Sequence, residues 1–133
     1  MFDVDNEHHK LDKLTEQIIG GAISVHRILG PGSLESAYEE CLCFELNQSK
    51  LHLERQVPLP VVYKDVRLDC GYRMDLVVEN SVIVEIKAVE RIIPVHEAQL
   101  LSYLKLADKR VGLLINFHVP VLKNGLKRIV NNF

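Results

Sequence analysis

The stretch VIVEIKAVE, residues 82–90, decides the fold of this chain. Its valines, isoleucines and alanine are typical of a strand buried inside an α/β protein, yet Glu85 and Lys87 interrupt it. An ionised side chain in such a strand costs several kcal/mol unless it is paired or bound to an ion. The stretch therefore predicts a central strand and a reason for keeping two charges on it.

The preceding residues, 72–78, predict a partner strand for 82–88, with Glu79-Asn80-Ser81 as the turn. The apolar faces of the two strands must coincide, because a slip of one residue would bring charges into the core. A three-residue turn satisfies this condition when Val78 faces Val82. The apolar face of the first strand then consists of Tyr72, Met74, Leu76 and Val78.

The same register places Asp75 directly opposite Glu85. Two carboxylates that face each other across a ladder, with Cβ atoms about 5 Å apart, repel one another. A hard divalent cation with oxygen ligands, such as Mg²⁺, would relieve that repulsion, and Lys87 would project beside it. The alternative is a solvent-facing charge ladder that pairs Asp75 with Lys87 and Arg73 with Glu85, which would contribute little.

Helical periodicity predicts a helix over 11–29, in which Gly20-Gly21 would let another backbone approach closely. Ser33 is a suitable N-cap for a second helix that runs to about Leu46. The other expected elements are short strands at 52–57 and 59–64, a turn at Lys64-Asp65, a helix from Pro94 to about Ala107, a buried strand at 111–117 and a last segment at 126–130. This order predicts one α/β domain over residues 1–133, with 1–10 as a flexible N-terminal segment.

Three further polar residues could contribute to a site. Glu35 lies in the first turn of the second helix, where it either stabilises the helix dipole or reaches the metal as a third carboxylate. Gln99 and Tyr103 are four residues apart and share a helix face. They either form a buried hydrogen bond or contact substrate.

Composition restricts the possible classes of protein. The chain has 133 residues, of which 47% are hydrophobic and 26% charged, as expected for one globular domain. The sequence has no apolar run of the roughly 20 residues that a membrane span needs. The polar N-terminus does not resemble a secretory signal, so we expect a soluble, cytoplasmic protein that does not bind membranes.

The net charge of −2 does not by itself indicate a nucleic-acid partner. Residues 1–50 carry 4 Lys and Arg against 9 Asp and Glu, whereas residues 111–133 carry 3 and none. A phosphate partner would need a metal or a local patch, plausibly Lys123, Lys127 and Arg128. Cys41, Cys43 and Cys70 are expected to be reduced thiols, and a zinc site recruiting His8-His9 is the less favoured alternative.

These residues resemble a known family. Residues 32–38, GSLESAY, match the motif of the GxxExxY proteins, a small group within the PD-(D/E)XK nuclease superfamily. Asp75 with Glu85-Ile86-Lys87 is similar to the D…(D/E)xK core of that superfamily, and Gln99 with Tyr103 is similar to its QxxxY element. Met74 departs from the pattern, which has proline before the aspartate. The resemblance implies a restriction-endonuclease-like core, with a mixed central β-sheet flanked by helices and two helices at the N-terminus.

The resemblance also implies roles for individual residues. Asp75 and Glu85 would bind Mg²⁺ or Mn²⁺, with the Ile86 carbonyl and Glu35 as further ligands. Lys87 would position or activate the attacking water, and Gln99 would orient substrate or Lys87. The residues expected to contact substrate are Tyr38, Arg73 and Tyr103.

The sequence supports three hypotheses about function. The leading one is a magnesium-dependent nuclease that hydrolyses DNA phosphodiester bonds, in which a homodimer would help to grip a duplex. The second is a nuclease-fold module that binds nucleic acid or a protein partner without cutting it. The third is a structural domain whose charges form a solvated ladder.

Overall fold

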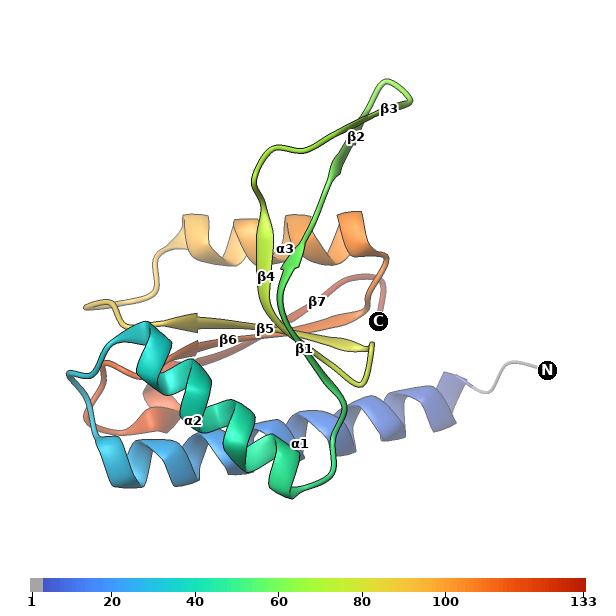
Figure 1. Cartoon of the computed structure of the whole chain (residues 1–133). Coiled ribbons are helices and arrows are strands. Elements are labelled where there is room, and N and C mark those ends of the chain that lie inside the picture. The colour runs from blue at the N-terminus through green and yellow to red at the C-terminus, as the bar shows by residue number, and fades with distance from the viewer. Residues whose placement is uncertain (1–3) are drawn as a thin grey trace.

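The computed structural model describes residues 4–133, which form one mixed α/β unit (Figure 1). Its elements in chain order are α1 (Val4–Leu29), α2 (Glu35–Gln48), β1 (Leu53–Pro58), β2 (Val61–Tyr63), β3 (Val66–Leu68), β4 (Arg73–Val78), β5 (Val82–Lys87), α3 (Pro94–Ala107), β6 (Val111–Asn116), a short 3-10 helix η1 (Leu122–Gly125) and β7 (Leu126–Val130). No helix in this described range is long and apolar enough to cross a membrane.

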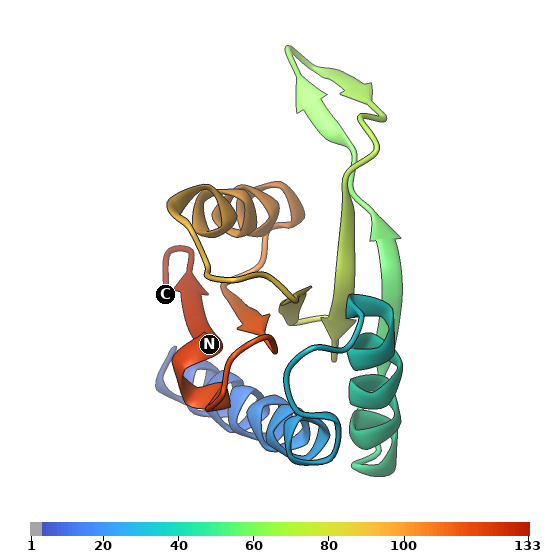
Figure 2. The same ribbon diagram turned by 90° about the vertical axis from the view of Figure 1, so that its left-hand side faces the viewer.

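Five strands form the central sheet in the order β1-β4-β5-β6-β7. The β5–β6 pair is parallel, because α3 crosses between the two strands, and the other three pairs are antiparallel. Helices α1 and α2 cover one face of the sheet, and α3 covers the other (Figure 2). The predicted mixed sheet, flanked by helices and preceded by two helices, is confirmed.

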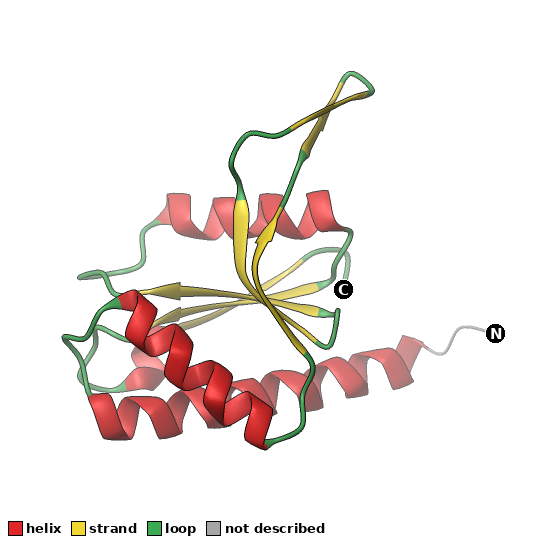
Figure 3. Cartoon of the chain, in the orientation of Figure 1, coloured by secondary structure: helices red, strands yellow, loops and turns green. Residues whose placement is uncertain are grey.

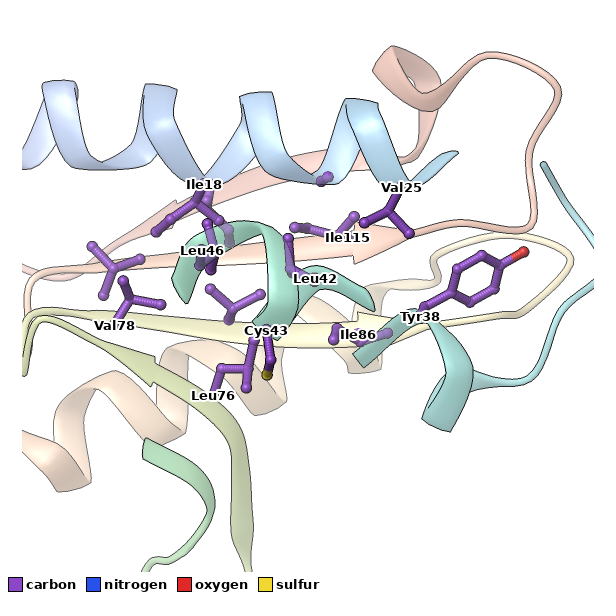
Figure 4. Packing of buried hydrophobic residues seen from close by; sticks show 14 of the residues in the cluster. Ile18, Val25, Tyr38, Leu42, Cys43, Leu46, Leu76, Val78, Ile86 and Ile115 are labelled. Atoms are coloured by element: carbon purple, nitrogen blue, oxygen red, sulfur yellow. The ribbon is translucent and has the colours of Figure 1, made fainter. Parts of the chain in front are cut away.

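The larger core lies between the sheet and the two N-terminal helices. It joins Ile18 and Leu42 from the helices to Leu76, Ile86 and Ile115 from the strands, all at most 1% exposed (Figure 4). A smaller core lies under α3, where Leu100, Tyr103 and Leu104 pack on the other side of the sheet. Because both faces are covered, every residue of β6 is buried, as its continuous apolar run predicts.

The predicted β4–β5 register is confirmed at the turn. Val78 pairs with Val82, Val77 with Ile83, and Leu76 with Val84. The ladder ends at the Leu76–Val84 pair, and beyond it β4 bends away from β5 (Figure 1). Asp75 and Glu85 are therefore the first residues of an opening between two strands, rather than a ladder pair.

The bend in β4 has a counterpart in its other neighbour, β1. Arg55 pairs with Leu76 and Val57 with Met74, whereas Gln56 between them has a left-handed backbone, with φ of 51°. This conformation interrupts the regular alternation of side chains. On β4, Leu76 lies in the larger core and Met74 in the core under α3, so the predicted place of Met74 on the face of Leu76 is wrong.

Beyond the bend, β2 and β3 form a separate two-stranded ribbon that projects from the domain (Figure 3). Lys64 and Asp65, the predicted turn, both have positive φ, as a tight two-residue hairpin requires. Val62 and Tyr63 are about 60% exposed, and neither core cluster of the described chain contains a residue from 61 to 71. We refer to residues 61–68 as the arm.

Three details of the helices differ from the sequence prediction. Helix α1 begins at Val4, so the expected flexible segment is helical from residue 4, and its first three residues lie outside the described range. Helix α2 has Leu34 as its N-cap, with no side-chain cap, so the predicted role of Ser33 is wrong. The close neighbours of Gly21 are side chains of α2 rather than the predicted backbone, and an added Cβ would lie 3.1 Å from the Leu46 side chain; Gly20 has no such neighbour.

Candidate active site

Asp75 and Glu85 form the centre of the candidate site. The backbone N–H of Asp75 donates to Glu85 Oε2 at 2.9 Å, and the backbone N–H of Ile86 donates to Asp75 Oδ2 at 2.8 Å. Each carboxylate therefore replaces a backbone carbonyl at the point where the β4–β5 ladder has opened. These reciprocal bonds hold the two acids beside each other, as the sequence predicts.

Glu85 is buried, with 6% of its surface exposed. Burial, followed by the negative charge of Asp75, raises the pKa of the Glu85 carboxyl from 4.5 to about 8. At neutral pH, a metal-free protein therefore holds a proton on this pair of acids. A cation between them would replace that proton and remove the repulsion.

Lys87 ends β5, is half-buried and faces the same side of the sheet as Glu85. Its positive charge lowers the pKa of the Glu85 carboxyl, but this effect is smaller than those of burial and of Asp75. Within residues 4–133, no ion pair joins Asp75 to Lys87 or Arg73 to Glu85. Together with the burial of Glu85, this finding does not fit the alternative of a solvent-facing charge ladder.

The Ile86 carbonyl lies on the side of β5 that faces the acids. In an extended strand, the N–H and C=O of one residue point to the same side, and those of the next residue point to the other side. The Ile86 N–H points to Asp75, and the Lys87 carbonyl accepts from the Phe117 N–H on the opposite side. The Ile86 carbonyl is therefore directed into the opening with the two carboxylates.

Glu35 begins α2 and is exposed. Among residues 4–133, no three His, Cys, Asp or Glu side chains lie close enough together to hold a metal ion. The structure therefore does not bring Glu35 to Asp75 and Glu85 as a third carboxylate. The same finding gives no support to a zinc site, and all three cysteines are free.

A different glutamate is connected to the site. Glu39 of α2 is buried, and its Oε1 accepts a 2.8 Å hydrogen bond from the Gln56 side chain, which also donates to Asp75 Oδ1 at 3.4 Å. Arg55 donates to Glu39 Oε2 at 2.8 Å and also to Glu40. This network, missed by the sequence analysis, fixes the outer oxygen of Asp75 through the side chain of the distorted residue Gln56.

The residues expected to contact substrate lie in different environments. Tyr103 lies on the inner side of α3 and is 5% exposed. Burial, followed by the charge of Glu85, raises the pKa of its hydroxyl, so this residue lies within electrostatic reach of the acids. Gln99 is exposed on the same helix, and no hydrogen bond joins it to Tyr103 in the described chain. Arg73 is exposed at the start of β4.

Tyr38 is fully buried in the larger core (Figure 4). Its ring stacks on that of Phe117, with ring centroids 4.4 Å apart. Its hydroxyl donates to the Gly30 carbonyl at 2.6 Å and accepts from the Ser33 N–H at 3.1 Å. Both functions of the hydroxyl are used by the α1–α2 loop. This placement argues against the expected substrate contact at Tyr38 and for a structural one.

The predicted basic patch is not assembled. Arg128 forms a 2.6 Å ion pair with Asp12 of α1, and Lys127 lies 3.7 Å from Glu97 of α3. The two side chains therefore point to opposite faces of the sheet, and their charges are compensated. Lys123 lies in η1, outside both pairs.

The donor set of the opening fits a hard divalent cation. It offers two carboxylates and one backbone carbonyl, all oxygen, and Mg²⁺ and Mn²⁺ prefer such ligands. Burial, and after it the negative charge of Asp75, raises the pKa of the Glu85 carboxyl, and a bound cation would offset both effects. Mg²⁺ usually keeps several waters, so three protein oxygens are an adequate set.

The central sheet, its flanking helices and the opening with its paired acids define a restriction-endonuclease-like fold. The family model described as "PD-(D/E)XK nuclease superfamily" matches residues 12–129, nearly the whole chain. The chain therefore belongs to the PD-(D/E)XK nuclease superfamily, whose nucleases generally depend on divalent metals and act on nucleic acid. No curated protein and no solved structure matches the chain.

Proposed function

We propose that this protein is a nuclease that hydrolyses DNA phosphodiester bonds with Mg²⁺ or Mn²⁺. The observation that carries the proposal is the pair of acids, Asp75 and Glu85, held together at the opened ladder with Lys87 on the same strand. A buried carboxyl whose pKa is raised by desolvation and by a neighbouring acid costs stability in a structural domain. Retention of the two acids is understandable if they bind a cation.

In this proposal, Asp75, Glu85 and the Ile86 carbonyl hold the cation. When bound, a divalent cation stabilises the negative charge that develops on a phosphodiester and favours deprotonation of water. The Lys87 ammonium orients the attacking water and neutralises charge on the phosphate. Arg73 and Gln99, both exposed, contact the DNA backbone on either side.

We further propose that the protein is one of the GxxExxY proteins. The loop supports this assignment, because Gly32 has φ of 100°, a value that favours glycine, and the Tyr38 hydroxyl fastens the loop. The structure offers no site contact that would require Glu35 of this motif. We therefore assign Glu35 to the helix N-terminus, where a negative charge is favourable, rather than to the metal.

The test is cleavage of single-stranded and double-stranded DNA by the pure protein with Mg²⁺ or Mn²⁺. We expect cleavage that is lost on chelation, in Asp75→Ala and in Lys87→Ala. A matched control is Asp65→Ala, which removes an exposed acid from the turn of the arm, the ribbon that projects from the domain (Figure 3). Cleavage that survives both site substitutions would contradict the proposal. Size-exclusion chromatography with and without duplex would test the expected homodimer.

A second candidate function is binding without cleavage. It is favoured by the absence of a third carboxylate near the pair within residues 4–133, and by the paired state of Lys127 and Arg128. Calorimetric titration with Mg²⁺ separates the two functions. No metal binding at millimolar concentration, together with salt-sensitive DNA binding, would favour the binding module.

A further inference from the structure

A pocket of about 470 Å³ lies on the α3 face of the domain. Tyr72, the residue before β4, forms one wall, and Gln99, Ser102 and Tyr103 of α3 form another. The volume is within the range of small-molecule sites in proteins. The pocket thus combines aromatic rings with an amide and a hydroxyl, and it is bounded by two elements of the candidate site.

Tyr103 links the pocket to the surroundings of the pair of acids. It belongs both to the lining of the pocket and to the core under Ile83, two residues before Glu85 on the same face of β5. The charges of Glu85 and Asp75, after burial, raise the pKa of the Tyr103 hydroxyl, so the two sites are within electrostatic reach. A ligand in the pocket would therefore be close to the opening.

The polar groups of the pocket are available to a ligand. No hydrogen bond to the Tyr103 hydroxyl is formed within the described chain, and no buried polar side-chain atom there lacks a partner. The hydroxyl must therefore reach solvent. Gln99 is exposed, and its amide can both donate and accept.

The aromatic wall has a free surface. Tyr72 is 41% exposed, and its ring lies 5.7 Å from that of Tyr103 at an interplanar angle of 47°. The tilted contact leaves the Tyr72 ring partly uncovered. An exposed aromatic ring beside donors and acceptors is the combination that binds unpaired nucleobases, because the ring stacks on the base and polar groups meet its edge.

We infer that this pocket binds one unpaired nucleobase next to the phosphate that is cut, with Tyr72 as the stacking residue. The inference rests on the proposed function and names its substrate class: single-stranded nucleic acid, including single-stranded flaps or frayed ends. A base within a duplex is stacked on both faces and cannot reach the Tyr72 ring. Extruding it costs at least as much as one stacking contact returns, so duplex DNA should bind this pocket poorly.

The experiment measures fluorescence anisotropy of labelled single-stranded and hairpin-duplex DNA in EDTA, so that no strand is cut. We expect wild-type protein to prefer the single strand. Tyr72→Ala should weaken single-strand binding by roughly 5- to 150-fold, the effect of losing one stacked base. Tyr72→Phe, which keeps the ring, should bind like wild type.

Tyr63→Ala provides the matched control, because Tyr63 is an exposed tyrosine of the arm that does not line the pocket. It should leave affinity unchanged. A second measurement avoids substitution altogether: abasic residues are placed at successive positions of the strand, and one position should weaken binding to wild type but not to Tyr72→Ala. The inference is overturned if no position has this effect, or if Tyr72→Ala binds single strands as tightly as wild type.

Failure of the inference and failure of the proposed function give different results. If wild type cleaves DNA but neither Tyr72→Ala nor an abasic residue changes single-strand affinity, the pocket assignment is wrong and the nuclease proposal stands. If wild type cuts nothing with Mg²⁺ or Mn²⁺ but binds bases through Tyr72, the proposed hydrolysis is wrong and the pocket assignment stands.

Discussion

Among single residues, Glu85 depends most strongly on its surroundings. Its side chain is buried beside another acid, on a strand whose other residues before Lys87 are all apolar. Because burial and Asp75 raise the pKa of its carboxyl to about 8, the folded protein binds a proton between pH 4.5 and 8 that the unfolded chain releases. The stability of the metal-free protein must therefore fall as pH rises through this window.

Glu85→Gln tests this dependence directly. We expect urea unfolding in EDTA to show that wild type loses more than about 1 kcal/mol between pH 5 and pH 8, since one pKa unit corresponds to about 1.4 kcal/mol. The variant should lack that loss, because an amide does not ionise. Glu16→Gln, an exposed acid of α1, should behave like wild type. Equal slopes for wild type and Glu85→Gln would contradict the assignment.

Gln56 is the second residue whose side chain matters to the site. It joins buried Glu39 to the outer oxygen of Asp75, so we expect it to hold Asp75 in a position suited to the cation. Gln56→Ala should lower Mg²⁺ affinity roughly 10-fold, the usual effect of losing a group that orients a ligand. It should also lower the unfolding free energy by about 1 kcal/mol or more, because buried Glu39 Oε1 loses its donor. Titration calorimetry measures this affinity, with Gln48→Ala, an exposed change in α2, as control. Unchanged Mg²⁺ affinity would show that Gln56 does not position Asp75 for the cation.

Among the elements, the α1–α2 loop is held from both ends by hydrogen bonds to one hydroxyl, that of Tyr38. The Tyr38 hydroxyl is hydrogen-bonded to the backbone of Gly30 and of Ser33, which lie on either side of Pro31 and Gly32. The first and last positions of the motif, Gly32 and Tyr38, are therefore part of one local structure. The loop determines where α2 begins, and α2 carries Glu39 to the site.

Tyr38→Phe should destabilise the protein without affecting the metal. Losing the hydroxyl leaves one carbonyl and one N–H without their partner, which costs about 1–3 kcal/mol. Urea unfolding measures the loss, and Tyr63→Phe on the exposed arm should show none. If Mg²⁺ affinity fell as much as in Gln56→Ala while stability held, the structural role of Tyr38 would be wrong.

Some of the strand pairing could be predicted from the sequence, and some of it could not. The β4–β5 register and the buried strand β6 followed from apolar alternation and from continuous apolar residues, which report directly which faces are covered. The bend at Gln56 did not, because a left-handed residue other than glycine leaves no compositional trace. The two central acids were therefore predictable, but the Glu39–Gln56 support depended on tertiary placement of α2.

At the scale of the whole molecule, the arm stands apart. Its two strands have three residues each, and a lone two-stranded ribbon is marginally stable in water. Neither core cluster of the described chain draws on residues 61–71. The arm can therefore open while both cores remain intact.

Limited trypsin digestion tests this independence. We expect the first cuts at Lys64 and Arg67, both exposed on the arm, and we expect the two fragments to co-elute with unchanged far-UV circular dichroism. Mass spectrometry of early time points identifies the cut sites. Initial cleavage at Lys87 or within α3 would show instead that the cores open first.

The opened ladder has one more consequence, for spectroscopy. Two main-chain amides, those of Asp75 and Ile86, donate to acids instead of carbonyls, and such N–H groups sense the charge of the acceptor. Their NMR resonances should therefore shift together when the acids gain a proton or a cation. These two signals would report, in solution and without any substrate, whether the acids hold a proton or a cation.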